Sequence, residues 1–217
     1  MRLGKEIGAH IRVIKSDEES NPQFINNPLN RCYFCRSELF GKMEEIANKE
    51  GLNHIADGAN IDDESDYRPG TIAQKKYSVR SPLKEAGLHK NEIRILSKKL
   101  GLSTFDKPAF ACLASRIPYG SKITPANLSM VDQAENYLMK LDFKIVRVRH
   151  YDKTARIEIG TEELERILDT ALRKKIVKKF KDIGYIYVTI DLEGFRSGSM
   201  NDVLNEHKET IVLNEHY

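Results

Sequence analysis

The segment of this sequence with the most reactive side chains is the loop Lys107–Gly120. It carries a thiol, a hydroxyl and a guanidinium close together, on Cys112, Ser115 and Arg116. Prolines near both ends of the segment and its final glycine interrupt regular structure, so the pattern predicts a fixed loop. A thiol beside an arginine that can grip a carboxylate or a phosphate is typical of group transfer. A buried cysteine between two domains is the alternative that the loop alone leaves open.

Two further cysteines, Cys32 and Cys35, form a Cys-x-x-Cys pair directly before a predicted helix over residues 36–49. Such a pair can be a redox couple, half of a zinc site or two ligands of an iron–sulfur cluster. With Cys112 the chain has three cysteines, so three thiolates can be gathered. Three thiolates suit a [4Fe–4S] cluster with one open iron that could take an external sulfide. A zinc site completed by a histidine and three unrelated thiols are the alternatives.

An acidic loop over residues 57–70 offers oxygen donors, among them Asn60 and Asp63, after a short predicted strand. Carboxylates at such a strand end could hold Mg²⁺ against ATP phosphates, although a solvated polar loop has the same composition. Arg147 and Arg149 alternate with valines on another predicted strand, so both side chains should point to one face. They could grip two anions there, or take part in surface salt bridges.

The elements that position these residues fall into two groups. Up to residue 120, short strands alternate with helices, which favours βα units and a parallel sheet. The strands are predicted over 7–14, 54–56 and 79–83, and the helices over 36–49, 71–76 and 91–100. From residue 121, a helix capped by Thr124 and Pro125 leads into a small α+β domain. Its strands are predicted over 143–150, 154–159 and 185–191, and its second helical pattern, broken once, over 162–183.

Composition excludes several classes of protein. The 217 residues are 40% hydrophobic and 31% charged, which is typical of a folded protein and not of a disordered one. A net charge of +3 is too small to predict nucleic-acid binding. No apolar run approaches the ~20 residues of a membrane span, and the N-terminus lacks a signal peptide's apolar core. With an odd number of cysteines and no disulfide framework, a cytoplasmic location is expected.

Five motifs, spread in matching order over nearly the whole chain, closely resemble the LarE family. They are Asn-Arg-Cys-Tyr-Phe-Cys at 30–35, Asp-Gly-Ala-Asn-Ile-Asp-Asp-Glu-Ser-Asp-Tyr-Arg-Pro-Gly at 57–70, Ala-Cys-Leu-Ala-Ser-Arg-Ile-Pro-Tyr-Gly at 111–120, Val-Arg-Val-Arg-His at 146–150 and Gly-Phe-Arg-Ser-Gly-Ser-Met-Asn at 194–201. LarE proteins are ATP-dependent sulfur transferases that help to build the nickel-pincer nucleotide cofactor of lactate racemase.

The resemblance implies a fold and a reaction. Residues 1–120 would be part of a PP-loop ATP pyrophosphatase of the adenine-nucleotide α-hydrolase fold, and residues 121–217 a small α+β domain for substrate binding and oligomerisation. ATP with Mg²⁺ would adenylate a carboxylate of pyridinium-3,5-biscarboxylic acid mononucleotide. A sulfur nucleophile would then displace AMP and leave a thiocarboxylate. A homo-oligomer is expected.

The resemblance also assigns residues. One branch of the family sacrifices a single cysteine, whereas another looks as if three cysteines hold a [4Fe–4S] cluster. Cys32, Cys35 and Cys112 resemble the second branch, with Cys112 as the sulfur-bearing or cluster-anchoring catalytic residue. Ser115 and Arg116 match positions near the substrate. The other residues expected to bind cofactor, phosphate or metal are Asn60, Asp63, Glu135, Arg147 and Arg149.

One family motif is absent from the sequence. The Ser-Gly-Gly-x-Asp-Ser PP-loop, which cradles pyrophosphate, is not found in these 217 residues, nor are the family's first strand and helix. The chain is therefore expected to be a truncated or mis-started family member that does not bind ATP productively by itself. Another PP-loop sulfur transferase, such as a tRNA thiolase, and a non-catalytic metal-binding remnant are the alternative functions.

Overall fold

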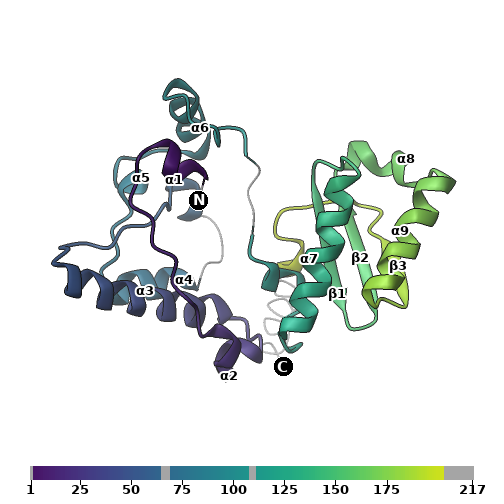
Figure 1. Ribbon diagram of the computed structural model, residues 1–217, viewed down its shortest axis with the longest axis horizontal. Coiled ribbons are helices and arrows are strands. Elements are labelled where there is room, and N and C mark those ends of the chain that lie inside the picture. The colour runs from purple at the N-terminus through teal and green to yellow at the C-terminus, as the bar shows by residue number, and fades with distance from the viewer. Residues whose placement is uncertain (1, 65–68, 108–110, 203–217) are drawn as a thin grey trace, which may run out of the picture. The chain divides into compact units, whose positions relative to one another are not determined.

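The computed structural model describes residues 2–64, 69–107 and 111–202 as a mixed α/β structure that is mostly helical (Figure 1). Its contacts divide the chain into two compact units, residues 1–109 and 110–217. Residues 65–68 of the acidic loop and residues 108–110 of the thiol loop lie outside the described residues. Among the described helices, none is long and apolar enough to cross a membrane.

The N-terminal unit is built around its longest helix, α3, Arg31–Glu50. This helix packs along α4 (Gly70–Lys76), and Gly70 at the start of α4 lies close to α3. A Cβ at Gly70 would lie 2.5 Å from Cδ of Arg36, so a larger residue would displace the Arg36 side chain. The other helices of this unit are α1 (Arg2–Glu6), α2 (Pro22–Ile25), α5 (Pro82–Glu85) and α6 (Lys90–Lys99).

Three expectations for this unit are wrong. The segment predicted as a strand over 7–14 follows helix α1 as irregular chain, because Gly8 turns at a φ of 67° and Val13 stays 77% exposed with no sheet face to bury it. Helix α3 begins at Arg31 and not at residue 36, so the Cys-x-x-Cys pair lies inside it. The strands predicted over 54–56 and 79–83 reduce to one parallel bridge, Ala56 to Arg80, since Pro82 starts α5.

The C-terminal unit is a small α+β structure with a three-stranded sheet in the order β1-β2-β3. Strand β1 (Val146–Tyr151) pairs antiparallel with β2 (Thr154–Ile159), which pairs parallel with β3 (Tyr187–Ile190). The helices are α7 (Pro125–Lys140), α8 (Leu164–Ile167) and α9 (Thr170–Ile183). The predicted cap of α7 is confirmed, because Oγ1 of Thr124 accepts a hydrogen bond from the Asn127 N–H at 3.1 Å.

The alternating residues of β1 and β2 give the sheet one apolar and one polar face. The apolar face is buried with side chains of α7 and α9 in the core: Ala134, Leu138, Val146, Val148, Ala155, Ile157, Ile159, Ile176 and Phe180. The polar face carries Arg147 and Arg149 of β1 and Arg156 and Glu158 of β2, with Arg147 paired opposite Glu158. The expectation that Arg147 and Arg149 share a face is confirmed.

The loop that contains Cys112 belongs to the C-terminal unit. Its short 3-10 helix, Leu113–Arg116, packs on α7 and β1, and Ile117 is buried. The division therefore falls between residues 109 and 110, whereas the sequence analysis placed the boundary between 120 and 121. The assignment of an ATP pyrophosphatase-like role to the first part and a substrate role to the second stays a prediction.

His150, at the apolar face of the sheet, makes stability depend on pH. It is 4% exposed, its Nδ1 lies 3.2 Å from the Tyr185 hydroxyl, and burial lowers its pKa below the ordinary 6.5. Between the two pKa values the unfolded chain binds more protons, so the free energy of unfolding should fall as pH drops through about 6.5 and level off below the folded pKa. Urea unfolding at several pH values should show a smaller pH dependence for His150→Gln. An identical dependence would contradict this explanation.

Candidate active site

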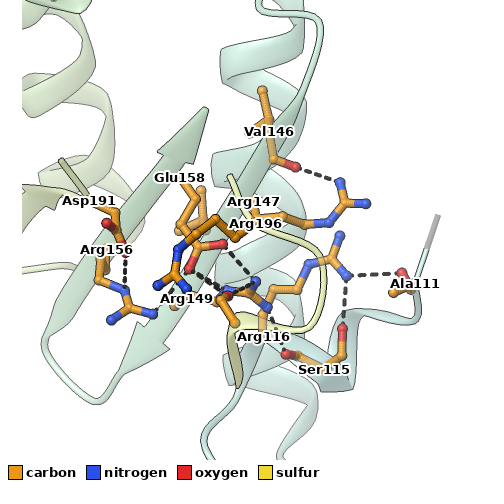
Figure 2. A network of polar contacts seen from close by, with 12 residues as sticks. Ala111, Ser115, Arg116, Val146, Arg147, Arg149, Arg156, Glu158, Asp191 and Arg196 are labelled. Atoms are coloured by element: carbon orange, nitrogen blue, oxygen red, sulfur yellow. Dashed lines mark hydrogen bonds and ion pairs between the residues drawn. The ribbon is translucent and has the colours of Figure 1, made fainter. Parts of the chain in front are cut away.

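The loop of Cys112 is organised by Arg116, whose guanidinium contacts Ala111 and Ser115 within the loop (Figure 2). Arg116 is only 1% exposed and forms a bidentate ion pair with Glu135 of α7. Its Nε donates to Oε1 at 2.8 Å and its Nη2 to Oε2 at 2.9 Å. Oε1 of Glu135 also accepts a hydrogen bond from the Val148 N–H of β1 at 2.9 Å. The Cys112 loop, helix α7 and strand β1 are therefore held together by one buried ion pair, Arg116 with Glu135.

The same guanidinium holds the backbone next to the thiol. Nη1 of Arg116 donates to the carbonyl oxygens of Ala111 at 3.0 Å and Cys112 at 3.2 Å, and to Oγ of Ser115 at 3.0 Å. The Ser115 hydroxyl in turn donates to the Cys112 carbonyl at 2.7 Å. Cys112 itself is exposed. Arg116 and Ser115 therefore fix the backbone that presents this thiol; their predicted contact with substrate stays a prediction.

Arg149 provides a second connection to this loop. It is 5% exposed and pairs with Glu158, with Nε to Oε1 at 2.8 Å and Nη2 to Oε2 at 2.6 Å. Its Nη1 donates to the Ser115 carbonyl at 3.1 Å, and its Nη2 donates to Oγ of Ser199 at 3.0 Å. Arg149 thus links β2, the Cys112 loop and the segment after β3.

Arg147 completes the cluster, and its environment is electrostatically different. Its guanidinium lies 5.1 Å from the centroid of the Phe195 ring, and its Nη1 donates to the Val146 carbonyl at 2.7 Å. Burial lowers the pKa of Arg147, and the positive charges of Arg116 and Arg149 lower it further, against the opposing effect of the two glutamates. Both effects disfavour the charged form of Arg147 within this cluster.

The predicted residues of the acidic loop lie in the N-terminal unit. The backbone N–H of Asn60 donates to Oδ2 of Asp63 at 3.0 Å, and Oδ1 of Asn60 accepts from the Asp62 N–H at 3.0 Å. These bonds form a compact turn with oxygen atoms at its surface. The arrangement is compatible with the predicted Mg²⁺ and nucleotide contacts, which stay predictions.

The sequence analysis missed Asp57, which organises this end of the N-terminal unit. Its carboxylate accepts hydrogen bonds from the Ser81 hydroxyl at 2.8 Å and the Ala59 N–H at 3.1 Å, and also from the side-chain amide of Gln74. Desolvation raises the pKa of Asp57, but the hydrogen bonds and nearby Arg36 outweigh it, so the pKa is lowered. The signal that could have identified Asp57 is its position directly after the predicted strand 54–56, because polar residues of functional sites gather at strand ends.

Cys32 and Cys35 lie one turn apart in helix α3, where residues three apart share a face. Cys32 is exposed, and the partly exposed Cys35 donates to Oε1 of Glu18 at 2.9 Å. Two thiols on one face fit a shared metal centre. Within each unit, the described residues contain no group of three or more potential ligands that could hold a metal ion. Since Cys112 belongs to the other unit, a centre held by all three cysteines stays a prediction.

Sequence reasoning also missed Glu158, the fully buried partner of Arg149. Its second carboxylate contact is Nη2 of Arg156, which lies 3.1 Å from Oε1 (Figure 2). Arg156 and Glu158 alternate with apolar residues in the predicted strand 154–159, a pattern that could have placed both on its polar face. What it lacked was the register, which pairs Arg149 with Arg156 and so leaves Glu158 two residues along β2 from the position opposite Arg149.

These features define a class of protein: a mixed α/β protein that presents an exposed thiol on a loop fixed by arginines, beside a positively charged sheet face. The chain is 36% identical over 206 residues to the pyridinium-3,5-bisthiocarboxylic acid mononucleotide synthase of Lactiplantibacillus plantarum, covering 95% of this chain and 74% of that protein. It therefore belongs to the LarE family, of which that synthase is a member.

Two other relatives extend the comparison. An uncharacterised protein of Synechocystis sp. is 44% identical over 200 residues, which is 92% of this chain and 75% of that protein. An uncharacterised protein of Methanocaldococcus jannaschii is 31% identical over 193 residues, 89% of this chain and 73% of that one. No protein-family model matches the chain.

Proposed function

We propose that this chain acts in ATP-dependent sulfur transfer, converting the carboxylates of pyridinium-3,5-biscarboxylic acid mononucleotide into thiocarboxylates for the nickel-pincer cofactor of lactate racemase. The observation that carries the proposal is the match over 95% of the chain to a synthase named for the bisthiocarboxylic product. The exposed Cys112, held by Arg116 beside three further arginines, supports it, since the substrate is an anion with two carboxylates and a phosphate.

The N-terminal unit would serve the ATP-dependent half of the reaction, as part of a PP-loop pyrophosphatase of the adenine-nucleotide α-hydrolase fold. The parallel bridge from Ala56 to Arg80, with Asp57 directly after it, is compatible with two neighbouring strands of such a sheet. Asn60 and Asp63 would hold Mg²⁺ and nucleotide there. ATP would lose pyrophosphate as its AMP moiety becomes joined to a substrate carboxylate.

The C-terminal unit would bind the pyridinium nucleotide. Arg147 is best suited to the phosphate, because burial and two neighbouring guanidiniums favour an anion beside it. Arg149, Arg116 and Glu135 would keep the Cys112 loop in place while the activated carboxylate reacts. Attack by sulfur on that carbonyl forms the carbon–sulfur bond, and the carbon–oxygen bond to AMP breaks, so that AMP leaves with the electron pair.

The sulfur source forms a separate part of the proposal. Cys32, Cys35 and Cys112 would hold a [4Fe–4S] cluster with one iron left open, since three thiolates fit that ligand set. When bound, such a cluster would supply a transferable sulfide. The proposal further includes a homo-oligomer and a cytoplasmic location.

The test of the function is to incubate a version of the protein that carries the PP-loop anaerobically with the pyridinium nucleotide, ATP and Mg²⁺ and to analyse the nucleotide by mass spectrometry. We expect exchange of carboxylate oxygen for sulfur, with AMP and pyrophosphate as the other products. Calorimetric titration of the same nucleotide without ATP should show binding by the C-terminal unit's site. A chain that neither binds nor converts the nucleotide, but protects RNA, would contradict the proposal and favour a tRNA thiolase.

A further inference from the structure

The segment after β3 carries an aromatic ring against the arginine cluster, and no role has been assigned to it so far. The ring is that of Phe195, whose centroid lies 5.1 Å from the guanidinium carbon of Arg147. A guanidinium over an aromatic face is attracted by the negative charge of the ring's π system. The attraction is larger where the cation has lost water, and Arg147 is partly desolvated.

The backbone around Phe195 is fixed on the end of β2. Its N–H donates to the Ile159 carbonyl at 2.7 Å. The preceding Gly194 has a φ of 69°, and a Cβ there would lie 2.8 Å from the Ile159 carbonyl oxygen and 3.0 Å from Cγ2 of Thr161. Only glycine permits this approach, so Gly194 helps to fix the backbone that carries the Phe195 ring. Upstream, the Asp191 N–H donates to the Ile157 carbonyl at 2.8 Å, which ties the start of the segment to β2 as well.

We infer that Phe195 is a positioning residue for Arg147: its ring holds the guanidinium in the orientation that binds the anionic phosphate of the substrate. The inference rests on the proposed function, which supplies both the anion site at Arg147 and the identity of the ligand. Ser199, further along the same segment, contacts Arg149 at 3.0 Å, so both arginines of β1 are contacted by this one segment.

The alternative is that Phe195 is only an apolar cover for the sheet edge. Substitutions separate the two roles. Phe195→Leu keeps the apolar character but removes the π face, whereas Phe195→Tyr keeps both. Leu192→Ala is the matched control, because Leu192 is in the same segment and is 84% exposed.

The experiment is calorimetric titration of the full chain with the pyridinium nucleotide and, separately, with inorganic phosphate. We expect Phe195→Leu to weaken binding of the nucleotide by about threefold to thirtyfold, and Phe195→Tyr and Leu192→Ala to stay within about twofold of wild type. In an Arg147→Ala background, Phe195→Leu should have no further effect. Thermal unfolding of each variant shows whether the fold is retained.

The outcomes distinguish this inference from the proposed function. If wild type binds phosphate but not the nucleotide, and Phe195→Leu weakens phosphate binding, the positioning role stands and the proposed substrate is wrong. If Phe195→Leu binds like wild type, or if its effect is equally large without Arg147, the positioning role is overturned. A wild-type chain that binds neither probe would overturn it as well.

Discussion

In a version of the protein that carries the PP-loop, Cys112→Ala is expected to abolish formation of the thiocarboxylate while the pyridinium nucleotide still binds. The thiol is exposed, whereas the loop is held through backbone carbonyls and the Ser115 and Arg116 side chains, none of which needs the sulfur atom. Mass spectrometry of the product and titration of the nucleotide measure the two effects separately. Thiocarboxylate formation at the wild-type rate by Cys112→Ala would rule out a sulfur-bearing or cluster-anchoring role for this residue.

Metal content decides which of those two roles Cys112 has. If the three cysteines hold one cluster, anaerobically purified wild type should contain about four irons, and alanine at Cys32, Cys35 or Cys112 should each lower that content. If Cys112 is instead a sacrificial donor, wild type should lose the mass of its sulfur during turnover and contain no iron. Zinc in place of iron would indicate a structural site.

Glu135→Ala is expected to lower the free energy of unfolding of the C-terminal unit by about 3–5 kcal/mol. The pair that it forms with Arg116 is almost fully buried, with side-chain exposures of 6% and 1%. Removal of the carboxylate leaves the guanidinium desolvated without its counter-charge, and it also leaves the Val148 N–H without its acceptor. Urea denaturation followed by circular dichroism measures the change.

Two comparisons make that result specific. Glu193→Ala removes an exposed carboxylate that lies 2.7 Å from Arg196, and it should leave the unfolding transition unchanged because water replaces the lost partner. Arg116→Met with Glu135→Leu removes both charges and should be less damaging than Glu135→Ala alone. If Glu135→Ala unfolds like wild type, the buried pair is not what holds the loop against α7.

In the C-terminal unit, local sequence signals correctly predicted where a helix begins and which strand residues share a face. Thr124 and Pro125 fixed the start of α7, and valines alternating with arginines fixed the two faces of β1, because both signals depend on neighbours in the sequence. In the N-terminal unit the same reasoning produced a strand over 7–14 that the structure does not contain. A strand needs a partner and a face to bury, and apolar residues such as Ile7, 56% exposed, do not supply either alone.

The sequence by itself determined the chemistry available to this protein: three cysteines, a hydroxyl and an arginine next to one of them, and the motifs that place the chain in its family. Only the tertiary structure decided how these groups are used. It showed that Arg116 and Arg149 are held by Glu135 and Glu158 and contact the Cys112 loop, and that Phe195 faces Arg147. The partners in each pair are separated by many residues or lie on different elements, and they meet because packing of the sheet against its helices buries the charges, which must then be paired.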